Sequence, residues 1–577
     1  MVRSGGSRSA RERTQCRSGI NGLVETRFML GPELGASPPS KNRGEIGMVN
    51  SHKVLSALLI IAGVASSQPA LSYSGDQTLG KVHFESSCSP EASANFDKGM
   101  LYQHSFWYNA SQKAFEQALK EDPKCAIAYW GIALSLLWNP HATPPPKNLP
   151  EGAAALAKGQ AISGATERER DYLTALSEMY KDFDKVDHRT RVLNYAKAME
   201  QLATKYPKDD EAQIFYALAL NISASPADKT YANQLKGAAI LETIWARQPD
   251  HPGVAHYLIH LYDAPALAGK GLKAAQRYAK VAPDAPHAQH MPSHIFTRVG
   301  AWTDSISSNA GAARAAKEDK SGHDQLHAMD YQVYAFLQLG QDDKAKAIMD
   351  EMPTVTGFTE TFLAGPFALA ASPARYAVER NDWKAAASLD VRPSPLPYVP
   401  AISWYAKALG AARSGDIETA KAGIAKLVEL RDQLREKKDA YWSEQVDIQS
   451  RIATAWVQYA SGNQDQALKT MSDAAEAEDK TDKHPVTPGP LAPARELYGA
   501  MLLQHGDAKK ALIAFEATMQ KEPNRLNTIL GAAKAAVASG DNAKARQYYS
   551  AALGLASNTS ITRPEVVEAR AYLASAK

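Results

Sequence analysis

The sequence has only three cysteines in 577 residues, and none of them forms a Cys-x-x-Cys pair. Thiol redox catalysis, which commonly depends on such a pair, therefore has no support. The short motifs GxSxG, HExxH and GxxxxGK[ST] are also absent, and no GxGxxG follows a predicted strand. These absences remove local support for a hydrolase, a zincin, and a nucleotide-binding or dinucleotide-binding protein.

A strong net charge is lacking as well, because the formal charge at pH 7 is only +3. Residues 1–72 contain nine Lys or Arg and four Asp or Glu, so the chain without this end has a formal charge of about −2. A near-neutral, slightly acidic chain argues against general nucleic-acid binding. We predict no nucleic-acid partner.

Long apolar stretches are limited to one run, residues 54–64. The run follows Met48 and a basic residue, and it precedes a small-residue cleavage pattern at residues 70–72, which together predict a secretory signal peptide over residues 48–72. The alternative is a membrane anchor, for which the run is too short to span a bilayer comfortably. Residues 1–47 show no periodicity and are interpreted as disordered or as a mis-called upstream leader. We expect a periplasmic or secreted protein with no membrane span after signal cleavage.

Two cysteines, Cys88 and Cys125, remain after removal of the leader, because Cys16 lies within it. Each of the two precedes the first helix of a predicted repeat. An even cysteine pair in an exported chain predicts a disulfide. The alternative is a pair of buried thiols.

The length indicates several domains or a repeat array, because a single hydrophobic core stops growing at roughly 250–300 residues. An internal repeat favours the array. In a segment that starts at Ala92, the offsets 8, 11, 24, 27 and 32 are occupied by Gly99, Tyr102, Phe115, Ala118 and Pro123. Small residues at such offsets let helices approach closely, and large residues fill the space between them.

The same register recurs near the C-terminus and again 34 residues later. The matching residues are Tyr498, Gly499, Leu502, Gly506, Ala511, Phe515 and Pro523, then Ala533, Ala536, Gly540, Ala545, Tyr549 and Ala552, while Thr518 replaces an expected alanine. Between the two ends, turn glycines each close a first helix and precede a second, at Gly300, Gly340, Gly415 and Gly462. We predict an all-α fold, a right-handed superhelical solenoid of about a dozen helix pairs whose first helices line the concave side.

Proline-rich stretches at 138–150, 391–400 and 480–493 interrupt the array and are predicted to be too irregular for helix. The predicted segments are an extended N-terminal segment at 73–91, an N-terminal array with the first proline-rich insertion and a histidine cluster at 92–321, central repeats at 322–400, and a C-terminal array at 401–577.

Several stretches, including CAIAYWGIAL, HPGVAHYLIHLYDAP, APHAQHMPSHIFTRVGAW and KHPVTPGPLAPARELYGAML, carry a resemblance to known proteins. The chain resembles secreted bacterial tetratricopeptide-repeat (TPR) proteins of a subgroup with no assigned function, over nearly all of residues 85–557. The resemblance implies a TPR-like scaffold that binds a protein or peptide in its concave groove. The groove positions of that family are 2, 5, 9, 12 and 13 of each first helix.

Four histidines stand out in this register. His256 and His260 are four residues apart, His290 and His294 are four residues apart, and the two pairs are 34 residues apart. A spacing of four places two side chains on one helix face, and a spacing of 34 is one repeat. With first helices starting at Pro252 and Pro286, the histidines occupy positions 5 and 9, so four imidazoles are expected to converge in the groove.

Further candidate ligands lie at neighbouring groove positions. His287 is at position 2, Asp263 is at position 12, and a following first helix predicted to start at Leu326 places His327 at position 2. Neutral imidazole binds zinc, copper, iron and nickel, and Asp263 is expected to bind the ion or to orient His260. The predicted metal set is His256, His260, His290, His294, His287, Asp263 and His327, with zinc or copper as the ion.

Other predicted groove residues are Arg298, Asp330, His104 and Trp130. Arg298 would add a positive rim suited to a carboxylate. A loop around His484 is interpreted as a rigid proline turn, with a lid over the groove as the alternative. The leading hypothesis is an exported scaffold that binds a protein, peptide or small ligand in its groove and has a histidine-rich metal site. The alternatives are a metal-dependent enzyme that uses the same histidines and a metal-free adaptor in envelope assembly.

Overall fold

The computed structural model describes residues 78–225, 227–557 and 563–575, and these residues form helices without any strand. The predicted leader and signal peptide lie outside the described residues. Consecutive helices pack against each other along the chain, for example α1 (Pro90–His104) on α2 (Tyr108–Glu121) and α18 (Tyr398–Ser414) on α19 (Ile417–Glu436). The predicted all-α solenoid is therefore confirmed.

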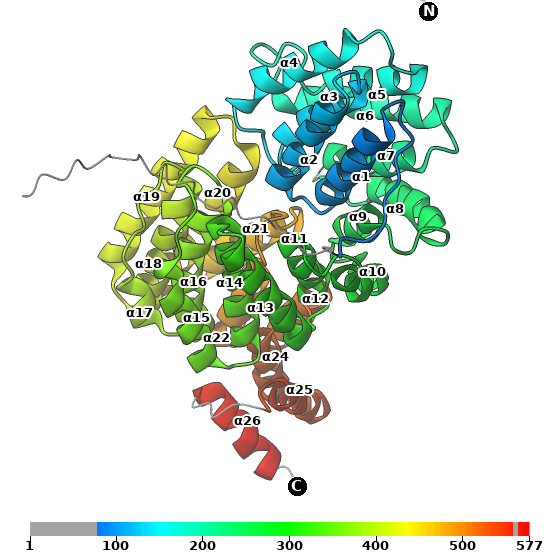
Figure 1. Cartoon of the computed structure of the whole chain (residues 1–577). Helices are drawn as coiled ribbons and strands as arrows, with labels where there is room; N and C mark the ends of the chain where they lie inside the picture. Colours follow the sequence, from blue (N-terminus) through cyan, green and yellow to red (C-terminus); the bar gives the residue numbers. More distant parts are fainter. Residues whose placement is uncertain (1–77, 226, 558–562, 576–577) are drawn as a thin grey trace, which may run out of the picture. The chain divides into compact units, whose positions relative to one another are not determined.

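The first eight helices show how the repeat register builds this packing (Figure 1). They are α1 (Pro90–His104), α2 (Tyr108–Glu121), α3 (Ala126–Leu136), α4 (Asn148–Gln160), α5 (Glu167–Ser177), α6 (His188–Lys205), α7 (Asp210–Ser223) and α8 (Ala232–Trp245). The Phe115 ring packs against both Gly99 and Gly131, where an added Cβ would lie only 2.5 Å and 2.6 Å from ring atoms. Phe515 packs in the same way against Gly499 and Gly531. The predicted pairing of a small residue with a large one is thus present at both ends of the array.

The middle of the chain contains the helices that position the histidines. They are α9 (Pro252–Tyr262), α10 (Ala268–Val281), α11 (Pro286–His290), α12 (Pro292–Arg298), α13 (Trp302–Glu318) and α14 (Gly322–Gln338). The starts of α9 and α11 agree with the predicted ones, whereas α14 begins at Gly322 rather than Leu326. The helix expected from Pro286 is divided into α11 and α12, because Pro292 has no backbone N–H to continue the helical hydrogen bonds. Gly300 closes the first helix as predicted, with φ of +68°.

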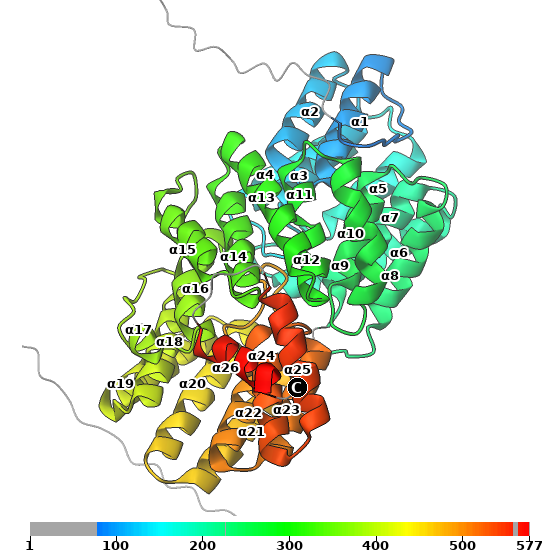
Figure 2. The ribbon, with the colours of Figure 1, turned by 90° about the horizontal axis from the view of Figure 1, so that it is seen from below.

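The remaining helices form the C-terminal part of the array. They are α15 (Asp342–Glu351), the short 3-10 helix η1 (Met352–Thr354), α16 (Ala364–Glu379), α17 (Trp383–Ala387), α18 (Tyr398–Ser414), α19 (Ile417–Glu436), α20 (Ala440–Ala460), α21 (Gln464–Asp479), α22 (Ala494–His505), α23 (Ala508–Lys521), α24 (Leu526–Ser539), α25 (Asn542–Leu555) and α26 (Pro564–Ser575). Figure 2 shows α18, α19 and α20 side by side, in agreement with their packing.

The proline-rich stretches are irregular, but two of them are shorter than predicted. α4 begins at Asn148 and α18 begins at Tyr398, so Pro150 and Pro400 lie inside helices. Both prolines occupy the first helical turn, where the missing N–H would have no helical partner anyway. Residues 480–493 contain no helix, as predicted.

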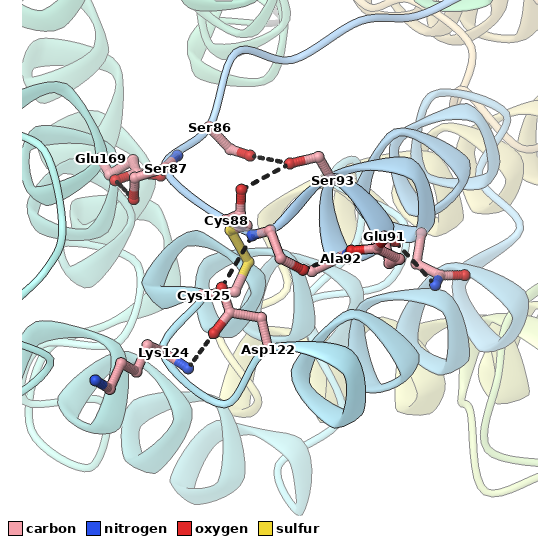
Figure 3. Close-up of a disulfide and its surroundings, with 12 residues drawn as sticks. Ser86, Ser87, Cys88, Glu91, Ala92, Ser93, Asp122, Lys124, Cys125 and Glu169 are labelled. Carbon is pink, nitrogen blue, oxygen red and sulfur yellow. Dashed lines mark hydrogen bonds between the residues drawn. A yellow bond between two sulfur atoms is a disulfide. The ribbon is translucent and has the colours of Figure 1, made fainter.

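The structure joins Cys88 and Cys125 as a disulfide (Figure 3). It ties the segment that precedes α1 to the start of α3. The Asp122 carboxylate beside it accepts hydrogen bonds from the backbone N–H groups of Ser89 and Lys124.

Among the described helices, none combines the length and the apolar composition needed to cross a membrane.

Candidate metal centre

Six histidines from four helices gather in two adjacent groups. The first histidine trio is His256, His260 and His287, from α9 and α11. The second histidine trio is His290, His294 and His327, from α11, α12 and α14. Within each trio, one nitrogen of every ring lies within 4.8 Å of the others. The two trios are neighbours, because the ring centroids of His260 and His294 are 6.2 Å apart.

The helical spacing explains how each trio forms. Residues four apart lie one turn above each other on a helix, and the Nε2 atoms of His256 and His260 are 3.1 Å apart. The Nε2 atoms of His290 and His294 are 2.9 Å apart. His287 lies on α11 one turn before His290, so α11 contributes one ligand nitrogen to each trio. The predicted convergence of the two histidine pairs is therefore what the structure shows.

The second trio has a fixed tautomer at His290. Its Nδ1 atom lies 2.6 Å from Asn309 Oδ1. The Asn309 amide orientation is set by its Nδ2 group, which donates to the Ser305 carbonyl at 2.8 Å. Asn309 Oδ1 can only accept, so His290 Nδ1 carries the proton and the neutral ring has a lone pair at Nε2.

His294 is fixed in the same tautomer by Asp263. Its Nδ1 atom donates to Asp263 Oδ2 at 2.9 Å. Burial alone would raise the pKa of Asp263, but the positive charges of Lys483 and Arg298 outweigh it and hold that pKa below its ordinary value. The ionised carboxylate can only accept, so His294 Nε2 also carries a lone pair in the neutral ring.

Two lone pairs therefore face each other at 2.9 Å across the His290–His294 pair. A proton between them is disfavoured, because burial lowers the pKa of His290 well below its ordinary value and the nearby His294 lowers it further. A shared cation would resolve the conflict. Zinc–nitrogen distances of about 2.0–2.1 Å put two ligands of a tetrahedral ion about 3.3–3.4 Å apart, so the two nitrogens, 2.9 Å apart, would have to separate by about 0.4–0.5 Å.

The first trio differs in its hydrogen bonding. His256 Nδ1 donates to the backbone carbonyl of His104 at 2.6 Å, which leaves a lone pair at Nε2. His260 can donate to that lone pair from its own Nε2, so this pair is satisfied with or without an ion. His287 Nε2 is buried without a hydrogen-bond partner. One ring nitrogen of the trio is thus free to bind an ion without breaking any hydrogen bond.

A cavity of about 420 Å³ lies beside the first trio. His260 and Asp263 line it, together with His141, His188 and Lys483 among others, and no histidine of the second trio does. The His141 ring stacks on the His260 ring with centroids 4.4 Å apart. The first trio therefore borders a cavity that the second trio does not reach.

The burial of the site differs from the open groove that was expected. His256, His290 and His294 are 0%, 3% and 2% exposed. Two proline-rich loops contact the site, since His141 of one stacks on His260 and Lys483 of the other donates to Asp263 at 2.9 Å. The loop around His484 joins α21 (Gln464–Asp479) to α22 (Ala494–His505), as predicted, and it also contacts the site through Lys483.

Asp263 and Arg298 have different contacts from those expected. Asp263 forms its hydrogen bond with His294 rather than with His260, because Asp263 follows the end of α9 and faces α12. Arg298 is 4% exposed and donates to Asp263 Oδ1 at 2.8 Å. The carboxylate that Arg298 binds is therefore one of the chain's own.

The other predicted groove residues are also buried. Asp330 is 2% exposed and accepts a hydrogen bond from Ser372. His104 bonds Glu211 at 3.0 Å, and its carbonyl orients His256. Trp130 packs in an aromatic core with rings that include Tyr172. None of these three side chains lies in either trio.

Three contributing residues were missed by sequence reasoning: Asn309, His141 and Lys483. Asn309 lies on α13, the helix that follows the histidine pair, where a polar residue carries no distinctive signal. His141 and Lys483 lie in proline-rich loops, whose spatial position no periodicity indicates.

No protein-family model matches the sequence, and no curated protein matches it. Solved structures that superimpose on it include a human IFIT1 dimer with m7Gppp-AAAA, at 12% identity, 82% coverage of this chain, 97% coverage of that chain and a TM-score of 0.34. Yeast Tom70 gives 12% identity, 84% and 96% coverage and a TM-score of 0.24. The TPR domain of P58(IPK) gives 15% identity, 64% and 99% coverage and a TM-score of 0.20. Likeness at this level says nothing about function, and the helical-repeat fold rests on the helix packing described above.

Proposed function

We propose that this helical-repeat protein binds transition-metal ions, with one ion in each histidine trio. The observation that supports this most directly is the pair of lone pairs at His290 Nε2 and His294 Nε2, 2.9 Å apart. Each ring has its Nδ1 proton committed to a fixed acceptor, which is the usual arrangement around a metal-bound histidine. An ion between the two nitrogens would remove the repulsion between their lone pairs.

We propose zinc or copper as the ion, among the transition metals that imidazole binds, which also include iron and nickel. Each trio offers neutral imidazole nitrogens, which bind borderline metals, whereas calcium and magnesium require oxygen ligands. Asp263 holds His294 from behind and is itself held by Arg298 and Lys483. In this proposal Asp263 positions a ligand and is not one itself.

Export is a further part of the proposal. The signal-peptide pattern at residues 48–72 indicates secretion to the periplasm or beyond. The Cys88–Cys125 disulfide supports it, because disulfides persist in oxidising compartments. A protein or peptide partner, which the repeat fold suggests, would contact surfaces away from the trios, because the trios are buried.

A second candidate function is a metal-dependent enzyme that uses the same histidines. The observation that favours it is the cavity beside His260. Three protein ligands leave a fourth position of a tetrahedral ion open for water or substrate. Spectra of cobalt-substituted protein would show an exchangeable water on the ion if this holds, and a coordinatively closed ion would contradict it.

The experiment that tests metal binding is elemental analysis of natively purified protein, followed by chelation and reloading with zinc or copper. We expect about two ions per chain, one for each trio. The double variant His290→Ala/His294→Ala should lose the ion of the second trio. His83→Ala is the matched control, because His83 is an exposed histidine that pairs with Asp97. A wild-type metal content no higher than that of a chain without both trios would overturn the proposal.

A further inference from the structure

The cavity beside the first trio contains polar groups that the metal centre does not use. Its volume of about 420 Å³ falls within the range of small-molecule sites, roughly 300–1,000 Å³. Because His260 lines it and the second trio does not, only an ion in the first trio would have its open coordination position at the cavity. The two proposed metal sites are therefore not equivalent.

Buried polar atoms without a hydrogen-bond partner lie in the residues that form the cavity wall. They are His141 Nε2, His188 Nδ1, Asn221 Nδ2 and Gln234 Oε1. These residues come from the first proline-rich loop, α6, α7 and α8, so four separate segments contribute. Native folds leave few buried polar groups unpaired. A polar molecule in the cavity would supply partners once these side chains turn toward it, because each of the four atoms is buried in the present conformation.

The carboxylates in the cavity wall already have partners within the chain. Asp263 accepts from His294, Arg298 and Lys483, Asp482 accepts from Lys229, and Asp228 accepts from Thr230. A cationic ligand would therefore find no carboxylate among the described lining residues that lacks a partner. The described lining residues carry three carboxylates and two cations, so their net charge does not favour an anion. Lys483 does, because it shares the Asp263 carboxylate with Arg298 and His294.

Lys483 is the residue that an anion would contact. Its side chain is 3% exposed, it lines the cavity, and it donates a hydrogen bond to Asp263 at 2.9 Å. An ammonium group has three N–H donors, so donors remain beyond the one that Asp263 uses. Arg189 is the second cation that lines the cavity, and its guanidinium already donates to the carbonyls of Ile222 and Ser223.

We propose that this cavity binds a small organic carboxylate. One carboxylate oxygen accepts a hydrogen bond from Lys483, and the group completes the coordination of the ion in the first trio. The cavity is larger than an inorganic anion needs, so it accommodates an organic body as well. The coordination step rests on the proposed function, whereas the contact with Lys483 does not.

The test is calorimetric titration of metal-loaded and chelated protein with benzoate, using the neutral analogue benzamide as the matched ligand control. We expect benzoate to bind the loaded protein and benzamide to bind it about tenfold more weakly or worse, because the amide oxygen that replaces the carboxylate accepts from Lys483 without a negative charge. Benzoate should also change the electron paramagnetic resonance spectrum of the copper-loaded protein. Lys483→Met should weaken benzoate binding by about tenfold, and Lys483→Arg should restore most of it.

A cavity-filling variant separates this site from the metal centre. Ala224 lines the cavity and belongs to neither trio, so Ala224→Trp should abolish benzoate binding and leave the metal content unchanged. Equal benzoate binding by Ala224→Trp and the wild type would overturn the inference, as would metal-loaded protein that binds no benzoate. If the protein takes up no metal on reloading but still binds benzoate through Lys483, the cavity site is supported and the proposed function is overturned, so the two failures are distinguishable.

Discussion

Lys483 Nζ lies 2.9 Å from Asp263 Oδ2, although the two residues are 220 positions apart in the sequence. The same carboxylate oxygen accepts the Nδ1 proton of His294, and the other accepts from Arg298. One buried carboxylate therefore connects the loop at residues 480–493, the end of α9 and the second trio. Its charge holds two cations and orients one proposed ligand.

Asp263→Asn should weaken both metal binding and stability. An amide at this position accepts less strongly from His294 Nδ1, and loss of such a ligand-orienting contact typically lowers metal affinity by about 10–100-fold. It also leaves Arg298 and Lys483 buried without their counter-charge, which should cost about 3–5 kcal/mol of unfolding free energy. Chelator competition measures the first effect and urea unfolding of the metal-free protein measures the second.

Asp447→Asn is the control for this change. Asp447 is a buried carboxylate in α20 that pairs with Arg431, Arg435 and Arg451, away from both trios. It should reduce stability without any effect on metal affinity. Equal metal affinity in Asp263→Asn and Asp447→Asn would contradict the role of Asp263.

Asn309→Leu tests the tautomer of His290. The leucine side chain cannot accept the Nδ1 proton, so His290 is free to place its proton on Nε2, where it blocks metal binding. We expect the second trio to lose about 10–100-fold in metal affinity while the first trio keeps its ion. Metal titration of the variant should therefore show one strong and one weak site, and two unchanged sites would count against the assignment.

Metal binding should also stabilise the fold. An ion that binds the folded chain alone at 100 times its dissociation constant adds about 2.7 kcal/mol to the unfolding free energy for each site. Thermal unfolding with and without zinc or copper measures the gain. His290→Ala/His294→Ala should reduce it, and a melting temperature insensitive to both metals would argue against the centre.

The sequence alone predicts the contacts that follow from the repeat register and from the histidine spacing. Gly99 with Phe115, and His256 with His260, are close in sequence and related by helical geometry, so their contacts follow from offsets alone. The 34-residue period then brings His290 and His294 beside them. Local periodicity was enough to assemble most of each trio.

Burial of the trios could not be predicted in the same way. It depends on Lys483 and His141, which lie in proline-rich loops without periodicity, and on contacts between residues as distant as Lys483 and Asp263. The groove positions of a generic repeat also assume an open concave face. Here those positions meet partners from other helices of the chain, since Arg298 bonds Asp263 at the end of α9 and Asp330 bonds Ser372 of α16.

Removal of the disulfide should destabilise the N-terminal helices. Cys88 and Cys125 are separated by 37 positions, and a cross-link of this kind stabilises a chain by about 2–4 kcal/mol. Urea unfolding of Cys88→Ser/Cys125→Ser should show a loss of that size. Wild-type protein in reducing buffer should approach the variant, and an unchanged midpoint in both cases would mean that the bond contributes little.

The Glu478 carboxyl group has an unusual titration. Burial raises its pKa to about 7, although the nearby Lys521 and the hydrogen bond from the Ala494 backbone N–H lower it. Its folded pKa is above the unfolded value of 4.5, so the folded state binds more protons between these values. Its contribution to stability is therefore present at acid pH and is lost as pH rises from about 4.5 through about 7.

Glu478→Gln should remove this loss. A glutamine oxygen still accepts from the Ala494 N–H group but needs no proton, so the variant should be more stable than the wild type at pH 8 by up to about 3 kcal/mol and nearly equal to it at pH 4.5. Urea unfolding at the two pH values measures the difference. Asp473→Asn is the matched control, because Asp473 is an exposed carboxylate on the same helix, α21, and pairs with Lys469 at 2.8 Å. It should give no gain at pH 8, and an equal gain from both variants would indicate a general charge effect rather than the burial of Glu478.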